Sequence, residues 1–136
     1  MAIEQITSPS VAEPAAGMWS NCLKVGDMDY VSGLTARDKD QKPSGTDDYA
    51  QTDLIFKRMA ALIEAAGGSL ADVVKLTIFV VDIGRREQVW RARREAFSGV
   101  FPACTLVQVS ALAPGILVEI EAVAVLNQGG RPVASA

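Results

Sequence analysis

Apolar and polar residues change their spacing several times along the chain, and each spacing predicts a different kind of element. Alternating runs at 22–25 and 29–32 flank Gly26-Asp27, a pattern typical of a β-hairpin. The segment 73–81 is apolar on both faces apart from Lys75 and Thr77, which favours a central strand covered on both sides. Two further strands are expected within 101–125, joined by a turn at Pro114-Gly115.

Helical spacing occupies the two stretches between these strands. The first helix is expected to begin after Ser44 or Thr46, either of which can cap it, and to stop at Gly67. Its apolar residues recur on one face, namely Ile55, Met59, Leu62, Ile63 and Ala66. Asp82 can cap a second helix that runs to about Phe97 and carries a strongly basic face.

The order strand, strand, helix, strand, helix, strand, strand predicts one α+β domain over residues 1–136. We expect a single mixed β-sheet with both helices packed on one face. The segments 1–16 and 127–136 are expected to be irregular tails. No helix is left for the other face of the sheet, so the apolar strand 73–81 favours cover by another copy of the chain.

The last strand holds the best candidate for chemistry. Its residues at 118, 120, 122 and 124 are apolar, and Glu119 and Glu121 point to the opposite face. Two such carboxylates cost free energy unless they are paired, hydrated or used. They could form ion pairs across a subunit contact, or Glu119 could serve a reaction while Glu121 raises its pKa by like-charge repulsion.

Composition narrows the classes of function. A formal charge of −3 and a pI near 4.9 disfavour binding to nucleic acids and to anionic membranes. The chain has no histidine, which excludes Ser-His-Asp and Cys-His catalysis and histidine-ligated metal sites. Its two cysteines, Cys22 and Cys104, form neither a metal motif nor a disulfide framework. With no signal peptide or membrane-spanning run in the sequence, we expect a cytoplasmic protein.

Six short motifs, in this order and spacing, are similar to those of a known family. They are V-S-G at 31–33, E-A-A-G at 64–67, V-V-K-L-T-I-F-V-V-D at 73–82, E-A-F at 95–97, F-P-A at 101–103 and V-E-I-E-A-V-A-V at 118–125. The chain resembles the Rid family, also called the YjgF/YER057c/UK114 family, over roughly residues 17–126. The resemblance implies a chorismate-mutase-like fold and a homotrimer with a ligand cleft at each subunit interface. It also implies hydrolysis of reactive enamines and imines to a carbonyl compound and ammonia, with no metal and no organic cofactor.

By position, the resemblance assigns seven residues to the cleft: Trp19, Ser32, Gly33, Arg91, Cys104, Leu106 and Glu119. Glu119 would be the catalytic residue and the others would bind substrate. The deaminase branch has an arginine that grips the substrate carboxylate where this chain has Cys104, and a thiol cannot make that bidentate contact. Asparagine and tyrosine are usual at the positions of Arg91 and Trp19, so the chain is expected to be a divergent member.

Each of these residues also has a structural interpretation. Arg91 either replaces the missing anion clamp or belongs to a solvated basic face. Cys104 either acts as a nucleophile beside an arginine or, as we favour, lines a pocket. Ser32 and Gly33 either line the cleft or end a strand, and Trp19 either covers the pocket or packs on a neighbouring chain.

Together these observations predict a Rid-type hydrolase of small enamines or imines, with water attack assisted by Glu119 in an inter-subunit cleft. The alternative is a non-catalytic trimeric protein that binds a small metabolite. RNA cleavage, an activity also ascribed to the family, is the least favoured because the chain is acidic and has no histidine.

Overall fold

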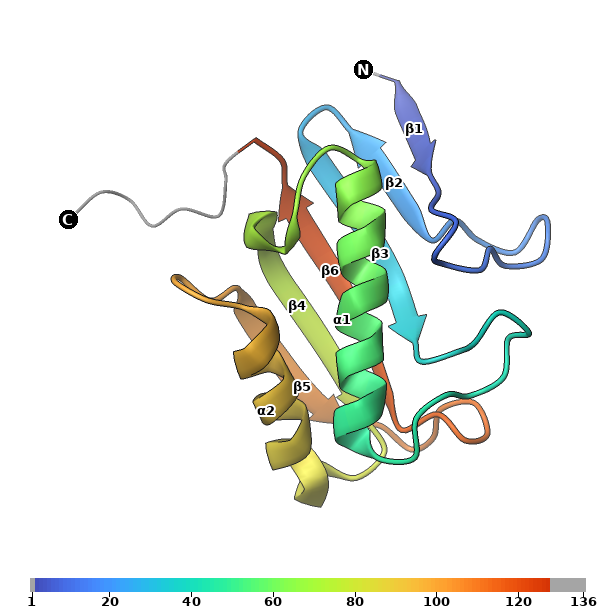
Figure 1. Ribbon diagram of the computed structural model, residues 1–136, viewed down its shortest axis with the longest axis vertical. Coiled ribbons are helices and arrows are strands. Elements are labelled where there is room, and N and C mark those ends of the chain that lie inside the picture. Colours follow the sequence, from blue (N-terminus) through green and yellow to red (C-terminus); the bar gives the residue numbers. More distant parts are fainter. Residues whose placement is uncertain (1, 128–136) are drawn as a thin grey trace.

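A computed structural model describes residues 2–127, in which two helices pack on one face of a six-stranded sheet (Figure 1). The strands are β1 (Ile3–Ile6), β2 (Cys22–Val25), β3 (Met28–Thr35), β4 (Val73–Val80), β5 (Ala103–Gln108) and β6 (Val118–Val125). The helices are α1 (Asp48–Ala65) and α2 (Arg86–Ala96), each accompanied by a short 3₁₀ turn, η1 (Leu70–Asp72) or η2 (Ile83–Arg85). The strand order is β1-β2-β3-β6-β4-β5, and only β4 and β5 run parallel among these neighbours. The predicted mixed sheet with two helices on one face is confirmed.

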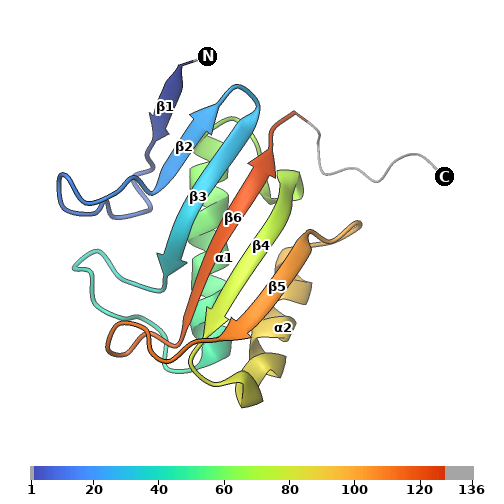
Figure 2. The same ribbon diagram turned by 180° about the vertical axis from the view of Figure 1, so that it is seen from behind.

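The core lies between the helices and the sheet. The predicted apolar face of α1 is buried throughout, as are the alternate residues 118, 120, 122 and 124 of β6. Leu76 and Ile78 of β4 meet them from the neighbouring strand. Seen from behind, the sheet lies in front of both helices, and no helix of the described chain covers that outer face (Figure 2). In the single chain, β4 is therefore covered on one side only.

The ends of α1 show how the sequence sets its limits. Asp47, rather than Ser44 or Thr46, caps the first turn, because its carboxylate accepts the backbone N–H of Ala50 at 2.7 Å. At the other end Gly67 adopts a φ of 101°, and the N–H of Gly68 donates to the carbonyl of Ile63. The predicted stop at Gly67 is confirmed.

Two sequence expectations need correction. Residues 3–6, expected to be irregular, form β1, which pairs with β2 at the sheet edge. The turn expected at Pro114-Gly115 is present, but the strands on either side of it, β5 and β6, are not neighbours, because β4 lies between them. Asp82 caps η2, and the helix proper begins four residues later, at Arg86. The expected tail at 127–136 lies outside the described residues except for Asn127, which is in a turn.

A buried acid joins β2 to β3. The thiol of Cys22 donates to Asp29 Oδ1 at 2.8 Å, and Asp29 Oδ2 is buried with no hydrogen-bond partner. Burial raises the pKa of Asp29, and this effect outweighs those of Cys22 and Lys24, which lower the pKa. The folded chain thus keeps the Asp29 carboxyl protonated to a higher pH than the unfolded chain does.

Among the described residues 2–127, neither helix has the length and apolar character needed to span a membrane.

This acid gives a prediction for stability. As pH rises from the ordinary aspartate pKa through the raised folded value, the unfolded state releases the Asp29 proton first, so the contribution of Asp29 to the free energy of unfolding falls. We expect Asp29→Asn to lose less stability than the wild type over that interval. Urea unfolding between about pH 4 and about pH 8 would measure both slopes, with exposed Asp40→Asn as the control. Equal slopes for wild type and Asp29→Asn would contradict the prediction.

Candidate active site

The site is built around an irregularity where β3 meets β6. Val31 pairs with Ala122 and Leu34 with Ile120, so three steps along β3 match two steps along β6. The extra residue makes a β-bulge at Ser32 and Gly33.

Glu119 of β6 lies directly against this bulge. A Cβ atom added to Gly33 would be 2.6 Å from Glu119 Oε2 and 2.9 Å from its carboxyl carbon. No side chain fits there while the carboxylate keeps this position, so Gly33 is required for the close approach and not for an unusual φ. The bulge thereby brings two of the predicted residues into contact.

The surroundings of Glu119 favour its protonated form more than water would. Burial is the largest cause of its raised pKa, the negative charge of Glu121 adds to it, and Arg37 opposes it. Neither Glu119 nor Glu121 belongs to any ion pair among the described residues. A half-buried carboxylate with a raised pKa and no cation bound to it can take up and release a proton at a higher pH than an ordinary glutamate does.

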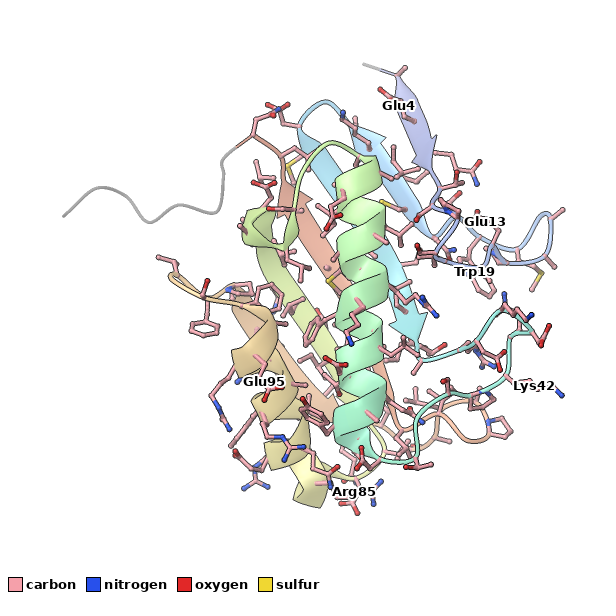
Figure 3. The ribbon with its side chains drawn as sticks, in the orientation of Figure 1. Glu4, Glu13, Trp19, Lys42, Arg85 and Glu95 are labelled. Carbon is pink, nitrogen blue, oxygen red and sulfur yellow. The ribbon has the colours of Figure 1, made fainter. Side chains whose placement is uncertain are left out.

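The loop between β1 and β2 is tied to the same bulge. The Ser32 hydroxyl donates to the carbonyl of Ser20, and the Ser32 N–H donates to the carbonyl of Asn21 at 2.9 Å. The indole N–H of Trp19 donates to Asn21 Oδ1 at 3.4 Å, while the residue stays 58% exposed. Figure 3 shows Trp19 and Glu13 on this loop, beside the end of β3. Ser32 therefore holds the Trp19 segment at the bulge.

Two of the cavities that Trp19 lines also reach β3. One, of about 320 Å³, is also lined by Gly33, Thr35, Arg37 and Arg58. The other, of about 370 Å³, lies on the outer face of the sheet and is lined by Ser32, Tyr30 and Glu121 as well. The structure thus gathers Trp19, Ser32, Gly33 and Glu119 in one region, which we call the bulge site.

The other three predicted residues lie elsewhere in the chain. Cys104 and Leu106 stand on β5 and pack toward the core, on the helix side of the sheet. Arg91 is exposed on α2, and its guanidinium lies over the ring of Tyr49, 3.8 Å from the centroid. Glu119 faces the opposite side of the sheet, so a single chain does not bring these three residues to the bulge site.

Sequence reasoning gave no separate role to Arg93, which the structure places at Cys104. Its Nη1 donates to Cys104 Sγ at 3.2 Å, and both residues line a further cavity of about 350 Å³. Arg93 stood out from the sequence only as one of several arginines on α2, and no spacing rule separates them. No group of three or more His, Cys, Asp or Glu residues in the described chain could hold a metal ion.

Comparison with known proteins gives consistent matches. The profile of the family described as endoribonuclease L-PSP matches residues 10–126. A 2-iminobutanoate/2-iminopropanoate deaminase of Dermatophagoides farinae is 31% identical over 130 residues, covering 93% of this chain and 100% of that protein. The Rattus norvegicus protein of the same name is 34% identical, with 90% of each chain covered.

Solved structures agree with these sequence matches. RidA from an Antarctic Psychrobacter superposes with a TM-score of 0.83 at 33% identity, covering 90% of this chain and 99% of RidA. A Mycobacterium tuberculosis member of the YjgF/YER057c/UK114 family gives a TM-score of 0.79 at 35% identity, with 92% and 100% covered.

Proposed function

The chain belongs to the endoribonuclease L-PSP family, which includes the Rid proteins, and from this premise we propose that it hydrolyses small 2-imino or 2-enamino acids to 2-oxo acids and ammonia. Relatives that are named 2-iminobutanoate/2-iminopropanoate deaminases support a hydrolase that acts on C–N bonds. The observation that carries the proposal for this chain is the carboxylate of Glu119, held against Gly33 with a raised pKa and no ion-pair partner among the described residues.

The proposed reaction needs one water molecule and one group that moves protons. Glu119, as the carboxylate, takes a proton from water while the water oxygen bonds to the imine carbon. Glu119 passes this proton to the former imine nitrogen, which gives a neutral carbinolamine. Glu119 then carries the hydroxyl proton to the same nitrogen, and the C–N bond breaks to release ammonia as the carbonyl forms. The products are a 2-oxo acid and ammonia, and Glu119 returns to its starting state.

We further propose that a neighbouring copy completes the cleft in a cytoplasmic homotrimer. The apolar residues left exposed on the outer face support such cover, among them Tyr30 at 46% and Val107 at 39%. The separation of Cys104 and Leu106 from Glu119 within one chain also supports a site shared between copies. The cysteines are both free thiols, which fits a reducing compartment.

Activity can be measured by supplying 2-iminopropanoate from an amino-acid oxidase and following pyruvate and ammonia. We expect release faster than spontaneous hydrolysis, from a species with the mass of a trimer in light scattering. An unchanged hydrolysis rate would overturn the deaminase proposal. If the protein still bound 2-oxo acids, that result would favour the non-catalytic metabolite-binding alternative.

The pH profile tests the role of Glu121. Because Glu119 must be ionised to accept a proton, kcat/KM should rise with pH through its raised pKa. Glu121→Gln removes the neighbouring negative charge, lowers the pKa of Glu119 and should move the rising limb to lower pH. Exposed Glu64→Gln on α1 is the matched control. A limb that stays in place, or moves to higher pH, would contradict this assignment.

A further inference from the structure

The arginines of η2 and α2 differ in what their guanidinium groups contact. Arg85 binds Asp48 and Asp82, Arg86 donates to the Ile83 carbonyl and lies over Trp90, Arg91 lies over Tyr49, and Arg94 binds Glu87 at 2.6 Å. Arg93 alone of these contacts neither a carboxylate nor a ring within residues 2–127. Its Nη1 donates a hydrogen bond to the thiol sulfur of Cys104, at 3.2 Å.

A thiol sulfur is a weak acceptor and uses little of what a guanidinium offers. Arginine has five N–H donors arranged as a planar fork, and Cys104 accepts one of them through Nη1. Partial burial of the Arg93 cation costs free energy, and no anionic partner among residues 2–127 offsets that cost. Arg93 therefore retains donors suited to bidentate binding of a carboxylate.

The space beside this guanidinium is suited to a small ligand. The cavity of about 350 Å³ is lined by Arg93, Arg94, Phe101, Pro102 and Cys104. Arg94 is already paired with Glu87, so Arg93 is the lining cation without a carboxylate partner among residues 2–127. Phe101 and Pro102 give an apolar wall for a short alkyl group. A cation opposite an apolar wall selects a small carboxylic acid over a neutral analogue.

We propose that Arg93 is the carboxylate-binding residue of this protein and that it restricts the substrates to 2-imino acids, as opposed to neutral imines. The inference rests on the proposed function for the reaction that the protein catalyses. The prediction that the ligand carries a carboxylate comes from the residues that line the cavity at β5. In the shared cleft, Arg93 would be supplied by the copy opposite Glu119. Cys104 acts as a positioning residue that orients the guanidinium.

Binding can be measured without turnover. Titration calorimetry with pyruvate, and with methyl pyruvate as its neutral analogue, would be run on the wild type, Arg93→Ala, Arg93→Lys, Arg91→Ala and Arg86→Ala. We expect Arg93→Ala to weaken pyruvate binding about tenfold, Arg93→Lys to recover part of the loss, and Arg86→Ala to match the wild type. Methyl pyruvate should bind weakly, and its affinity should be the same for the wild type and for the two Arg93 variants. Thermal unfolding of each variant would establish that the fold is retained.

Two results would overturn the inference. One is pyruvate binding that is absent in the wild type or unchanged in Arg93→Ala, and the other is a loss seen in Arg91→Ala in place of Arg93→Ala. Hydrolysis assays separate this inference from the proposed function. Arg93-dependent pyruvate binding without imine turnover would refute the deaminase alone, whereas turnover with a KM indifferent to Arg93→Ala would refute the carboxylate site alone.

Discussion

Replacing Glu119 with glutamine is expected to slow imine hydrolysis by about 10²- to 10⁴-fold, the usual contribution of a positioned acid–base group. Glutamine keeps the shape and much of the hydrogen bonding of glutamate, but it can neither accept a proton from water nor pass one to the leaving nitrogen. Folding should be unaffected or slightly favoured, because the substitution removes a half-buried charge that lies beside Glu121.

The measurement compares kcat and KM for 2-iminopropanoate between wild type and Glu119→Gln, with thermal unfolding as the check on folding. A lost proton transfer should lower kcat and kcat/KM together and leave KM nearly unchanged. Glu64→Gln, an exposed carboxylate on α1, should behave like the wild type. A fully active Glu119→Gln variant would mean that the carboxylate is structural and that the reaction, if any, uses another group.

Much of the fold could be predicted because local patterns agree with the packing. The alternation in β6 and the apolar face of α1 each predict which side of the element is buried, and in both elements that side is buried. The position of β4 between β5 and β6 could not be read in this way, because strand neighbours are set by long-range pairing. β1 escaped detection because only Ile6 of its four residues is buried, which leaves too little alternation to recognise.

The candidate site was predicted in part for a similar reason. The alternation of apolar and polar residues along β6 predicted that Glu119 points away from the core, and this prediction needed only the residues next to it in sequence. The contact between Glu119 and Gly33 depends on a bulge between distant strands, which no local pattern specifies. The role of Arg93 could not be predicted from the sequence either. Arg93 differs from the neighbouring arginines only in its contacts, because Arg85 and Arg94 are paired with carboxylates and Arg93 is not.

Gly33→Ala is expected to lower kcat/KM by about 100-fold, since small misplacements of a catalytic group cost this much. The new methyl carbon would be 2.6 Å from Glu119 Oε2, whereas ordinary contact begins near 3.4 Å. The atom it meets is the far end of a flexible side chain, so Glu119 can turn aside and the fold should lose little stability. The activity is lost because the carboxylate no longer lies where it can hold the attacking water.

A double-mutant cycle separates this cause from general damage. If Gly33→Ala acts only by moving the carboxylate, then Gly33→Ala/Glu119→Gln should be as slow as Glu119→Gln alone, and the two effects will not add. Gly84→Ala is the matched control, because its Cβ would lie 3.0 Å from Asp82 Oδ1, a carboxylate outside the bulge site. That variant should retain wild-type rates. Additive losses in the double mutant would show that Gly33 serves the reaction by another route, such as backbone contact with the substrate.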